Sequence, residues 1–283
     1  MTDTILVTGA TGNLGRSVVQ ALRTTGFRVK AASRHPETVP LAEHVEAVRM
    51  DYTDPSTVAP ALANVKGVFL IAPPMDPEAP AKLKPIIEKA KTLGVEHIVF
   101  TSALGADQSE QSPLRIVERA LIASGVNYTI LRPNFFMENF SAGFVSPMIK
   151  SQGSIFLAAG EGKTSFISTQ DIAEVAATAF AKKLFGKEYN LTGPDALDHT
   201  EVARIISRAI GKKITYQPLS EEAMLQGARQ MGMPEGAVQY MRVLYAAVRA
   251  GYTAAVTSDV ETVTGRKPMT FDAFARKNAA AWA

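Results

Sequence analysis

The stretch that decides the fold is TGATGNLGR, residues 8–16, which places Gly9, Gly12 and Gly15 within seven positions. The preceding residues, TILV, are apolar and rich in β-branched side chains, which is typical of a buried strand. The following residues, SVVQALRTTG, repeat apolar side chains at helical spacing and end at Gly26, a common helix stop. The glycines therefore lie where a strand turns into a helix, and free N–H groups at such a helix N-terminus favour an anion.

The composition is that of an ordinary folded protein of 283 residues, 46% of them apolar, with room for one large domain or two smaller ones. Its 30 basic residues are scattered among 27 acidic ones, so we expect neither nucleic acid nor a membrane as a partner. Cysteine is absent, which excludes disulfides, thiolate metal sites and cysteine nucleophiles. MTDTILVTGA lacks the basic start of a signal peptide, and no run reaches the about 18 apolar residues of a membrane span, so we expect a cytoplasmic location.

Two periodicities alternate from the first strand to residue 133. Strand-like runs follow at 28–33, 45–50, 67–72, 97–102 and 127–132. Helix-like stretches lie near 13–25, 55–63, 79–93 and 112–124. This alternation predicts an α/β fold of the Rossmann type, a doubly wound parallel sheet with helices on both faces. Because ligands bind at the carboxyl ends of the strands in such sheets, each loop after a strand is a candidate wall of one site.

The glycine turn is the candidate pyrophosphate site. A glycine-rich turn alone can be a structural loop, but this one follows the first strand, opens the first helix and begins the alternating pattern. Its spacing, G-x-x-G-x-x-G, differs from the G-x-G-x-x-G fingerprint and matches the variant of extended and atypical short-chain dehydrogenases. We predict that it binds a dinucleotide through the three glycines and their neighbours Thr11, Asn13 and Leu14.

The residues after the second strand favour NADP over NAD. An Asp or Glu there would accept hydrogen bonds from the ribose 2′-OH of NAD, but this chain has Ser33 and Arg34, and a guanidinium can bind the 2′-phosphate of NADP. The alternative is that Arg34 is a solvated loop cation. After the third strand, Asp51 and Tyr52 suit the edge and face of adenine, although Asp51 is equally placed to cap the helix that begins near Pro55.

Seven segments together resemble the NmrA-like family of atypical short-chain dehydrogenases: ILVTGATGNLG, SRHPE, RMDYTDPSTV, FLIAPP, IVFTSALGA, YTILRPNFFMENF and FISTQDIAEVAA. This family includes triphenylmethane reductases, NADPH quinone oxidoreductases, azoreductases and festuclavine dehydrogenases, as well as redox sensors that bind NADP without known catalysis. The resemblance implies a Rossmann core that binds NADP(H), with a smaller C-terminal part over the nicotinamide. The further loop residues that we expect at the cofactor are Ala72, Pro73, Pro74, Thr101, Ser102 and Pro133.

The Tyr-x-x-x-Lys pair of typical short-chain dehydrogenases, in which lysine lowers the tyrosine pKa for proton transfer, is missing. The helix after the fifth strand reads SPLRIVERALIASG and carries Arg115 and Glu118. For these two we expect a surface ion pair, a role in the site being the alternative. Ser102, at the end of the fifth strand, is then the one candidate catalytic hydroxyl, and a weak one. We therefore expect direct hydride transfer to electrophiles that need no acid.

Other chemistries find no support in the sequence. GEGKTS at 160–165 lacks the first glycine of a P-loop, whose position holds Leu157, so Lys163 is expected to be an ordinary hairpin residue. There is no G-x-S-x-G elbow. The four histidines are far apart and lack the spacing of a metal site.

The segment RPNFFMENF, 132–140, is the candidate substrate wall, because it leaves the sixth strand at its carboxyl end. Its rings would serve equally well as ordinary core. An aromatic cleft with a few amides, made by Asn134, Phe135, Phe136 and Asn139, suits a flat hydrophobic small molecule.

We predict a cofactor-binding core over 1–133 and a substrate-binding part over 134–283, of which 163–192 returns to the core. In the second part we expect a hairpin at 153–169, then a helix, a strand at 187–193 and mainly helices, whose methionines form an adaptable lid or ordinary core. The predicted function is NADPH-dependent reduction of a quinone, iminium, azo compound or cationic dye; the alternative is a non-catalytic NADP(H) sensor. We expect a monomer or a small homo-oligomer.

Overall fold

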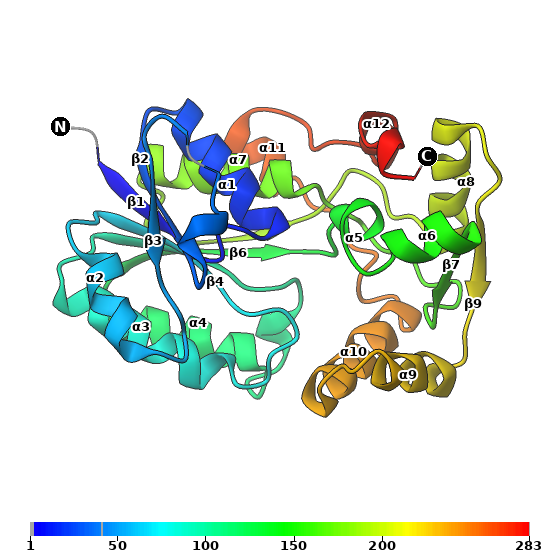
Figure 1. Cartoon of the computed structure of the whole chain (residues 1–283), viewed down its shortest axis with the longest axis horizontal. Coiled ribbons are helices and arrows are strands. Elements are labelled where there is room, and N and C mark those ends of the chain that lie inside the picture. Colours follow the sequence, from blue (N-terminus) through cyan, green and yellow to red (C-terminus); the bar gives the residue numbers. More distant parts are fainter. Residues whose placement is uncertain (1–2, 41, 283) are drawn as a thin grey trace.

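The computed structural model describes residues 3–40 and 42–282 and is built around a seven-stranded sheet with helices on both faces (Figure 1). In order across the sheet, the strands are β3 (Val45–Arg49), β2 (Arg28–Ser33), β1 (Thr4–Val7), β4 (Gly67–Ile71), β5 (His97–Thr101), β6 (Asn127–Pro133) and β8 (Lys187–Leu191). All neighbouring strands run parallel. The prediction of an α/β fold of the Rossmann type is confirmed.

Two groups of helices cover the sheet. One face carries α1 (Asn13–Thr24), α7 (Thr169–Ala181) and α11 (Asp259–Thr264), and the other carries α2 (Val58–Leu62), α3 (Ala79–Thr92) and α4 (Pro113–Ser124). Successive residues of a strand point to opposite faces. Along β1, Ile5 and Val7 therefore pack with α1 and α7, while Leu6 packs with the other group. Coverage of both faces explains why the strands are continuous apolar runs.

The strand order reverses between β1 and β4. From β1 the chain moves outward through β2 to β3, and it then returns to β4 and continues through β5 and β6 on the other side. At such a switch point the loops diverge and leave a crevice at the carboxyl ends of the strands. The glycine turn follows β1 directly, so it lies at this crevice.

The C-terminal part has its own core. Its elements are α5 (Glu138–Ser141), α6 (Ser146–Gln152), β7 (Ser154–Leu157), α8 (His199–Ile210), β9 (Thr215–Pro218), α9 (Glu221–Gln230), α10 (Glu235–Arg249) and α12 (Phe271–Lys277). Single turns of 3-10 helix lie at Pro36–Thr38, Pro55–Thr57, Ala106–Gln108 and Ala279–Ala281. Phe140, Phe166, Phe271 and Trp282 lie in one buried cluster at the centre of this part. Among the described residues, no helix is long and apolar enough to cross a membrane.

The hairpin predicted at 153–169 is wrong. β7 pairs in parallel with β9, and Ser154 lies opposite Thr215, so its partner comes from far along the chain. The glycine turn that suggested a hairpin tip is packed instead against the end of α10, where a Cβ on Gly162 would lie 2.2 Å from the carbonyl oxygen of Val248. Lys163 is accordingly not a hairpin residue, and it forms an ion pair with Glu201 at 3.5 Å.

Three later elements return to the Rossmann core. β8 pairs with β6, and α7 packs against α1 and the sheet. The sequence pattern did not separate α11 from the C-terminal helices, yet Val260 and Val263 of α11 belong to the same buried cluster as α1 and α7. The two parts of the chain are therefore interleaved rather than consecutive.

Asp171 on α7 holds the segment that leads to α12. It is buried, and its carboxylate accepts a hydrogen bond of 2.9 Å from the backbone N–H of Met269. Burial raises the pKa of Asp171 from its ordinary 3.8 to about 6, against the opposing effect of the hydrogen bond, and the nearby Glu174 and Glu138 carboxylates add to the rise.

This raised pKa predicts a stability that falls with pH. The folded state holds the Asp171 proton more tightly than the unfolded chain, so the stabilisation is complete below about pH 4 and is lost as the pH rises through about 6. Asp171→Asn keeps the acceptor for Met269 without the charge. We expect this variant to gain about 1–2 kcal/mol over the native protein at pH 8 and little at pH 4. Urea unfolding at both pH values measures the difference, with exposed Asp195→Asn as the control; equal effects at both pH values would contradict the assignment.

Candidate active site

The glycine turn brings the backbone of α1 against the end of β1. Gly9 has a φ of +59°, in the left-handed region where glycine carries no steric cost. A Cβ on Gly15 would lie 2.1 Å from the carbonyl oxygen of Gly9, so only glycine allows the helix to pack this closely. Gly12 is the N-cap of α1, and a Cβ there would meet only that same oxygen, at 3.4 Å. Its outer side is open, and an anion can approach the first N–H groups of the helix.

The end of β2 places a cation near this turn. Arg34 is exposed, and no ion pair of its guanidinium is found within 3–40 and 42–282. Ser33 is buried, and its hydroxyl oxygen accepts a hydrogen bond of 3.1 Å from the N–H of His35. Arg34 also helps to keep the pKa of Asp51 low, although hydrogen bonds from Thr53 are the larger cause. An exposed guanidinium that forms no ion pair with a described residue and lies near a helix N-terminus suits a phosphate.

The two candidate adenine residues differ in their surroundings. Asp51 accepts hydrogen bonds from the N–H and hydroxyl of Thr53, and the residue that caps the following 3-10 turn is Asp54. The alternative role of Asp51 as the helix cap is therefore wrong. Tyr52 donates a hydrogen bond of 2.7 Å to the carbonyl of Ile71 at the end of β4, and its ring packs against the core under α2 and α3. Burial raises its pKa.

Two buried hydroxyls lie at the end of β5. The Oγ1 atom of Thr101 has no hydrogen-bond partner among the described residues, whereas the Ser102 hydroxyl lies beside the Glu118 carboxylate and helps to lower its pKa. Buried polar atoms in folded proteins are nearly always hydrogen-bonded, and an unsatisfied one costs about 1–3 kcal/mol. The Thr101 hydroxyl is thus available to a ligand, with Ser102 next to it. The backbone around them is well ordered by hydrogen bonds to β6, from Ser102 to Leu131 and from Leu104 to Pro133.

A buried ion-pair network lies behind this strand end. The Glu118 side chain is completely buried and accepts two hydrogen bonds of 2.8 Å from Arg132 and one of 2.9 Å from Arg115. Arg132 also donates to Glu188 on β8. Burial alone would raise the pKa of the Glu118 carboxyl, but the hydrogen bonds from Arg132, the adjacent Ser102 hydroxyl and Arg115 hold it below its usual range, so it is ionised at neutral pH.

The expected surface ion pair of Arg115 and Glu118 is therefore wrong. The Arg115 side chain is 15% exposed and the Glu118 side chain 0%. Glu118 is buried because it has a third partner, Arg132, whose guanidinium neutralises its carboxylate. The spacing of Arg115 and Glu118 along the helix gives no sign of this partner.

The segment after β6 joins the two cores. Phe135 packs on the C-terminal core and meets Tyr245 edge-on, whereas Phe136 packs on the Rossmann core. Asn134 is buried and donates both amide hydrogens at 2.8 Å, to the hydroxyl of Ser165 and to the carbonyl of Thr253. Its side chain therefore fixes the backbone and offers no donor to a ligand. Asn139 is partly exposed on the same segment.

The sequence pattern gave no sign of Glu138 in this segment. Its carboxylate accepts hydrogen bonds from the N–H of Thr169 at 3.0 Å and from the hydroxyl of Ser168 at 3.2 Å, at the N-terminus of α7. Burial raises its pKa against these hydrogen bonds. No local pattern could have found this pairing, because the partners lie about 30 residues away in the chain.

The loop between β4 and α3 crosses from the Rossmann core toward α10. After the expected cofactor residues 72–74, Met75 adopts a φ of +52°, which is uncommon for a residue other than glycine, and it packs against the C-terminal core. Pro77 then lies so close to α10 that a Cβ on Gly236 would be 3.1 Å from its Cγ. The loop therefore links the Rossmann core to the first turn of α10.

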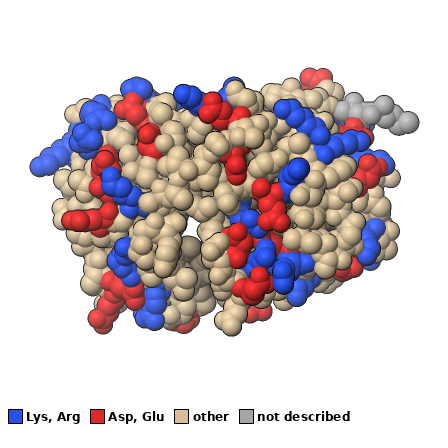
Figure 2. All heavy atoms as spheres, turned by 180° about the vertical axis from the view of Figure 1, so that it is seen from behind, with Lys and Arg blue, Asp and Glu red and all other residues tan. Residues whose placement is uncertain are grey.

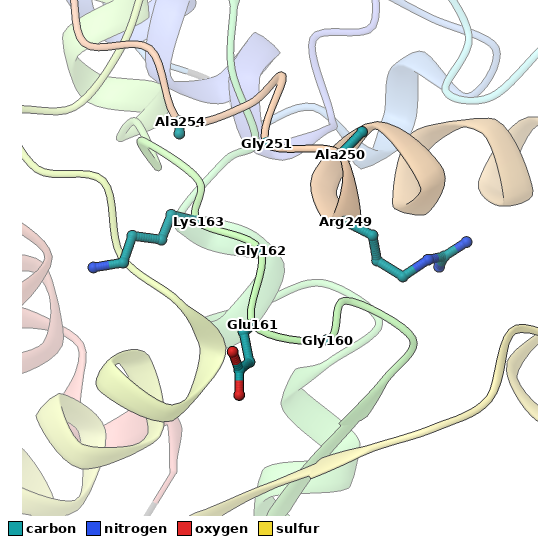
Figure 3. Close-up of a pocket in the computed structure, with 8 residues that line it drawn as sticks. All are labelled: Gly160, Glu161, Gly162, Lys163, Arg249, Ala250, Gly251 and Ala254. Carbon is teal, nitrogen blue, oxygen red and sulfur yellow. The ribbon is translucent and has the colours of Figure 1, made fainter.

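A separate pocket of about 510 Å³ lies between the 160–163 turn and the end of α10 (Figure 3). Its charged side chains point away from one another: Lys163 toward Glu201, and Arg249 toward the carbonyl of Ala158. None of the predicted site residues lines it. Its lining residues therefore do not converge on a common point where a dinucleotide could bind.

The fold and its glycine turn place the chain among the Rossmann-type dinucleotide-binding proteins. Within that class it belongs to the NmrA-like family, whose model matches residues 1–275, as the resemblance in the sequence predicted.

Three known proteins illustrate the similarity. The NAD(P)H azoreductase of Xenophilus azovorans is 35% identical over 287 aligned residues, which cover 98% of this chain and 99% of that protein. The structure of the NADPH-dependent quinone oxidoreductase of Escherichia coli complexed with NADPH has a TM-score of 0.83 at 28% identity, with 96% and 99% of the chains covered. The structure of Citrobacter sp. triphenylmethane reductase complexed with NADP(H) has a TM-score of 0.81 at 26% identity, with 98% and 99% covered.

The buried network predicts a large effect of a small substitution. Glu118→Gln removes the charge that compensates Arg132 and Arg115, and breaking a buried pair from one side typically costs about 3–5 kcal/mol. We expect urea unfolding to show a loss of this size. Glu110→Gln is the matched control, because Glu110 also pairs with Arg115 but is 60% exposed, and it should lose less than about 1 kcal/mol. Similar losses in both variants would mean that burial of the network contributes nothing.

Proposed function

We propose that this protein is an NADP(H)-dependent oxidoreductase that transfers hydride directly to a flat, electron-poor small molecule, such as a quinone, iminium, azo compound or cationic dye, without a Tyr/Lys acid pair. The coarser assignment, an oxidoreductase of the NmrA-like type that uses NADP(H), rests on family membership and on the three relatives described above. The finer assignment, direct hydride transfer to a flat acceptor without an acid pair, rests on the residues at the ends of the strands.

The observation that carries the proposal is the buried, unpartnered hydroxyl of Thr101, with Ser102 next to it, across the switch point from the open glycine turn. The residues present fit a dinucleotide: the Gly9–Gly15 turn would hold the pyrophosphate, Arg34 the 2′-phosphate, and the two hydroxyls the nicotinamide end. When bound, the reduced nicotinamide supplies the hydride. The protein's own part is to bind, to orient and to exclude water.

The surroundings of Ser102 supply no strong acid. A serine hydroxyl has too high a pKa to protonate a ketone oxygen effectively, and the Glu118 carboxyl is ionised by its arginine partners and has no proton to donate. Positioned acids typically contribute about 10²–10⁴-fold to such reductions. Acceptors that delocalise the electron pair or already carry positive charge need this help least, so they are the expected substrates.

Acidic and basic side chains are interspersed over the face in Figure 2, and this face is hollowed between the two parts of the chain. An interspersed surface gives no single-sign patch for a nucleic acid on this face. A small hydrophobic molecule in the cleft is the partner that we propose.

Cofactor choice is the first prediction of this proposal. Arg34→Ala should weaken NADPH binding by about 1.5–3 kcal/mol, the range for a hydrogen bond to a charged group, and should leave NADH binding nearly unchanged. The two dissociation constants, measured by fluorescence titration, decide this. Arg28→Ala at the opposite end of β2 is the control. Equal losses for NADPH and NADH would remove Arg34 from the phosphate site.

Turnover is the second prediction. We expect the protein to oxidise NADPH with quinones, azo compounds and cationic dyes and to reduce simple ketones poorly, as followed by absorbance at fixed NADPH.

Ser102→Ala should lose less than about tenfold in kcat, whereas Gly12→Val should abolish NADPH binding in a folded protein. A loss of about a thousandfold in Ser102→Ala with NADPH affinity intact would show that an acid is needed. Tight NADPH binding without turnover of any acceptor would favour the sensor alternative.

A further inference from the structure

Helix α10 carries two apolar stripes, of which only one has a partner. The buried stripe, Val238, Met241, Tyr245 and Val248, packs into the C-terminal core. A second stripe is half-buried and consists of Ala237, Tyr240, Leu244 and Ala247. Its members are three or four residues apart and so share one side of the helix. Within the described part of the chain, none of them packs on any of the three core clusters.

The contacts of α10 show which way the second stripe faces. Gly236 lies one turn before Tyr240 on the same side, and it touches Pro77 of the β4–α3 loop. Helix α9 lies elsewhere around α10, since its Glu221 pairs with Arg242 at 3.2 Å and with Arg249. Figure 1 shows α10 between α9 and the Rossmann core, and Figure 2 shows the surface hollowed between the two parts of the chain. The second stripe therefore faces the cleft.

The chemistry of the stripe suits a flat ligand. Tyr240 is the one aromatic side chain of the second stripe, and its hydroxyl makes no hydrogen bond to any residue that the structure describes. Two half-buried side chains that pack on the neighbouring C-terminal core, Phe135 and Met75, come from the loops after β6 and β4. An aromatic ring prefers offset stacking on another ring, and its face also attracts a cation.

We propose that Tyr240, with Leu244 beside it, is the specificity-determining wall of the substrate cleft and selects acceptors with an extended flat aromatic framework by stacking against them. This rests on the proposed function, because it names the acceptor class of that same site. Tyr240 is a positioning residue: it holds the acceptor and takes no part in proton transfer.

The test compares two quinones that differ in the number of rings. With 9,10-phenanthrenequinone, Tyr240→Ala should raise KM about tenfold with little change in kcat, and with the single ring of 1,4-benzoquinone KM should change less than about twofold. Tyr240→Phe should restore the native KM, because the ring is kept. Val243→Ala is the matched control, since Val243 neighbours Tyr240 on the same helix but is 67% exposed.

Two kinetic results would overturn the proposal. Equal rises in KM for both quinones would show that Tyr240→Ala disturbs the cleft in general. A fall of about a hundredfold in kcat for Tyr240→Phe would make the phenol a proton donor instead of a stacking surface.

A binding experiment separates this proposal from the proposed function. Malachite green, a cationic dye with three aryl rings, is titrated by its absorbance into the protein saturated with NADP⁺, so no turnover is required. We expect Tyr240→Ala to bind the dye about tenfold more weakly, and Tyr240→Phe and Val243→Ala to bind it with native affinity. This result supports the stacking wall even if the native protein reduces no acceptor. Unchanged dye affinity in Tyr240→Ala overturns it.

Discussion

The guanidinium of Arg132 reaches from β6 to the fully buried carboxylate of Glu118 on α4 through two hydrogen bonds of 2.8 Å. Neither charge could remain in this position without the other, because an unpaired buried ion costs several kcal/mol. The pair fixes the end of β6, and from that end the chain divides its aromatic residues between two cores, Phe135 in one and Phe136 in the other. This buried contact therefore helps to set the position of the C-terminal part relative to the cofactor loops.

Features that depend on neighbouring residues were predictable from the sequence. The strands were visible as apolar runs because both faces of the sheet are covered, and α4 was bounded by Pro113 at its first turn and by Gly125, whose φ is +80°. The anion-binding turn was also predictable, because Gly9 and Gly15 are only six residues apart and the close contact that requires glycine is between these two residues. For each of these features, the residues that cause it lie close together in the sequence.

Features that depend on distant partners were not predictable. The sequence predicted a hairpin after β7 because a glycine turn follows that strand. No residue near β7 indicates that its partner is instead β9, about 60 residues further along the chain. The burial of Glu118 depends on Arg132, which is 14 residues further along. Tyr240 was hidden for a different reason: a half-buried stripe beside a buried one resembles the border of an ordinary amphipathic helix, and only the missing core partner distinguishes it.

Asn134 ties the end of β6 to Ser165 and to the carbonyl of Thr253, segments that are 31 and 119 residues away in the sequence. Both of its amide hydrogens are used in this way, and Ser165 and Thr253 are hydrogen-bonded to each other, so one buried side chain ties the end of β6 to the segment that follows α10. A segment anchored in this way presents Phe135 and Phe136 in the same position whether the site is empty or filled.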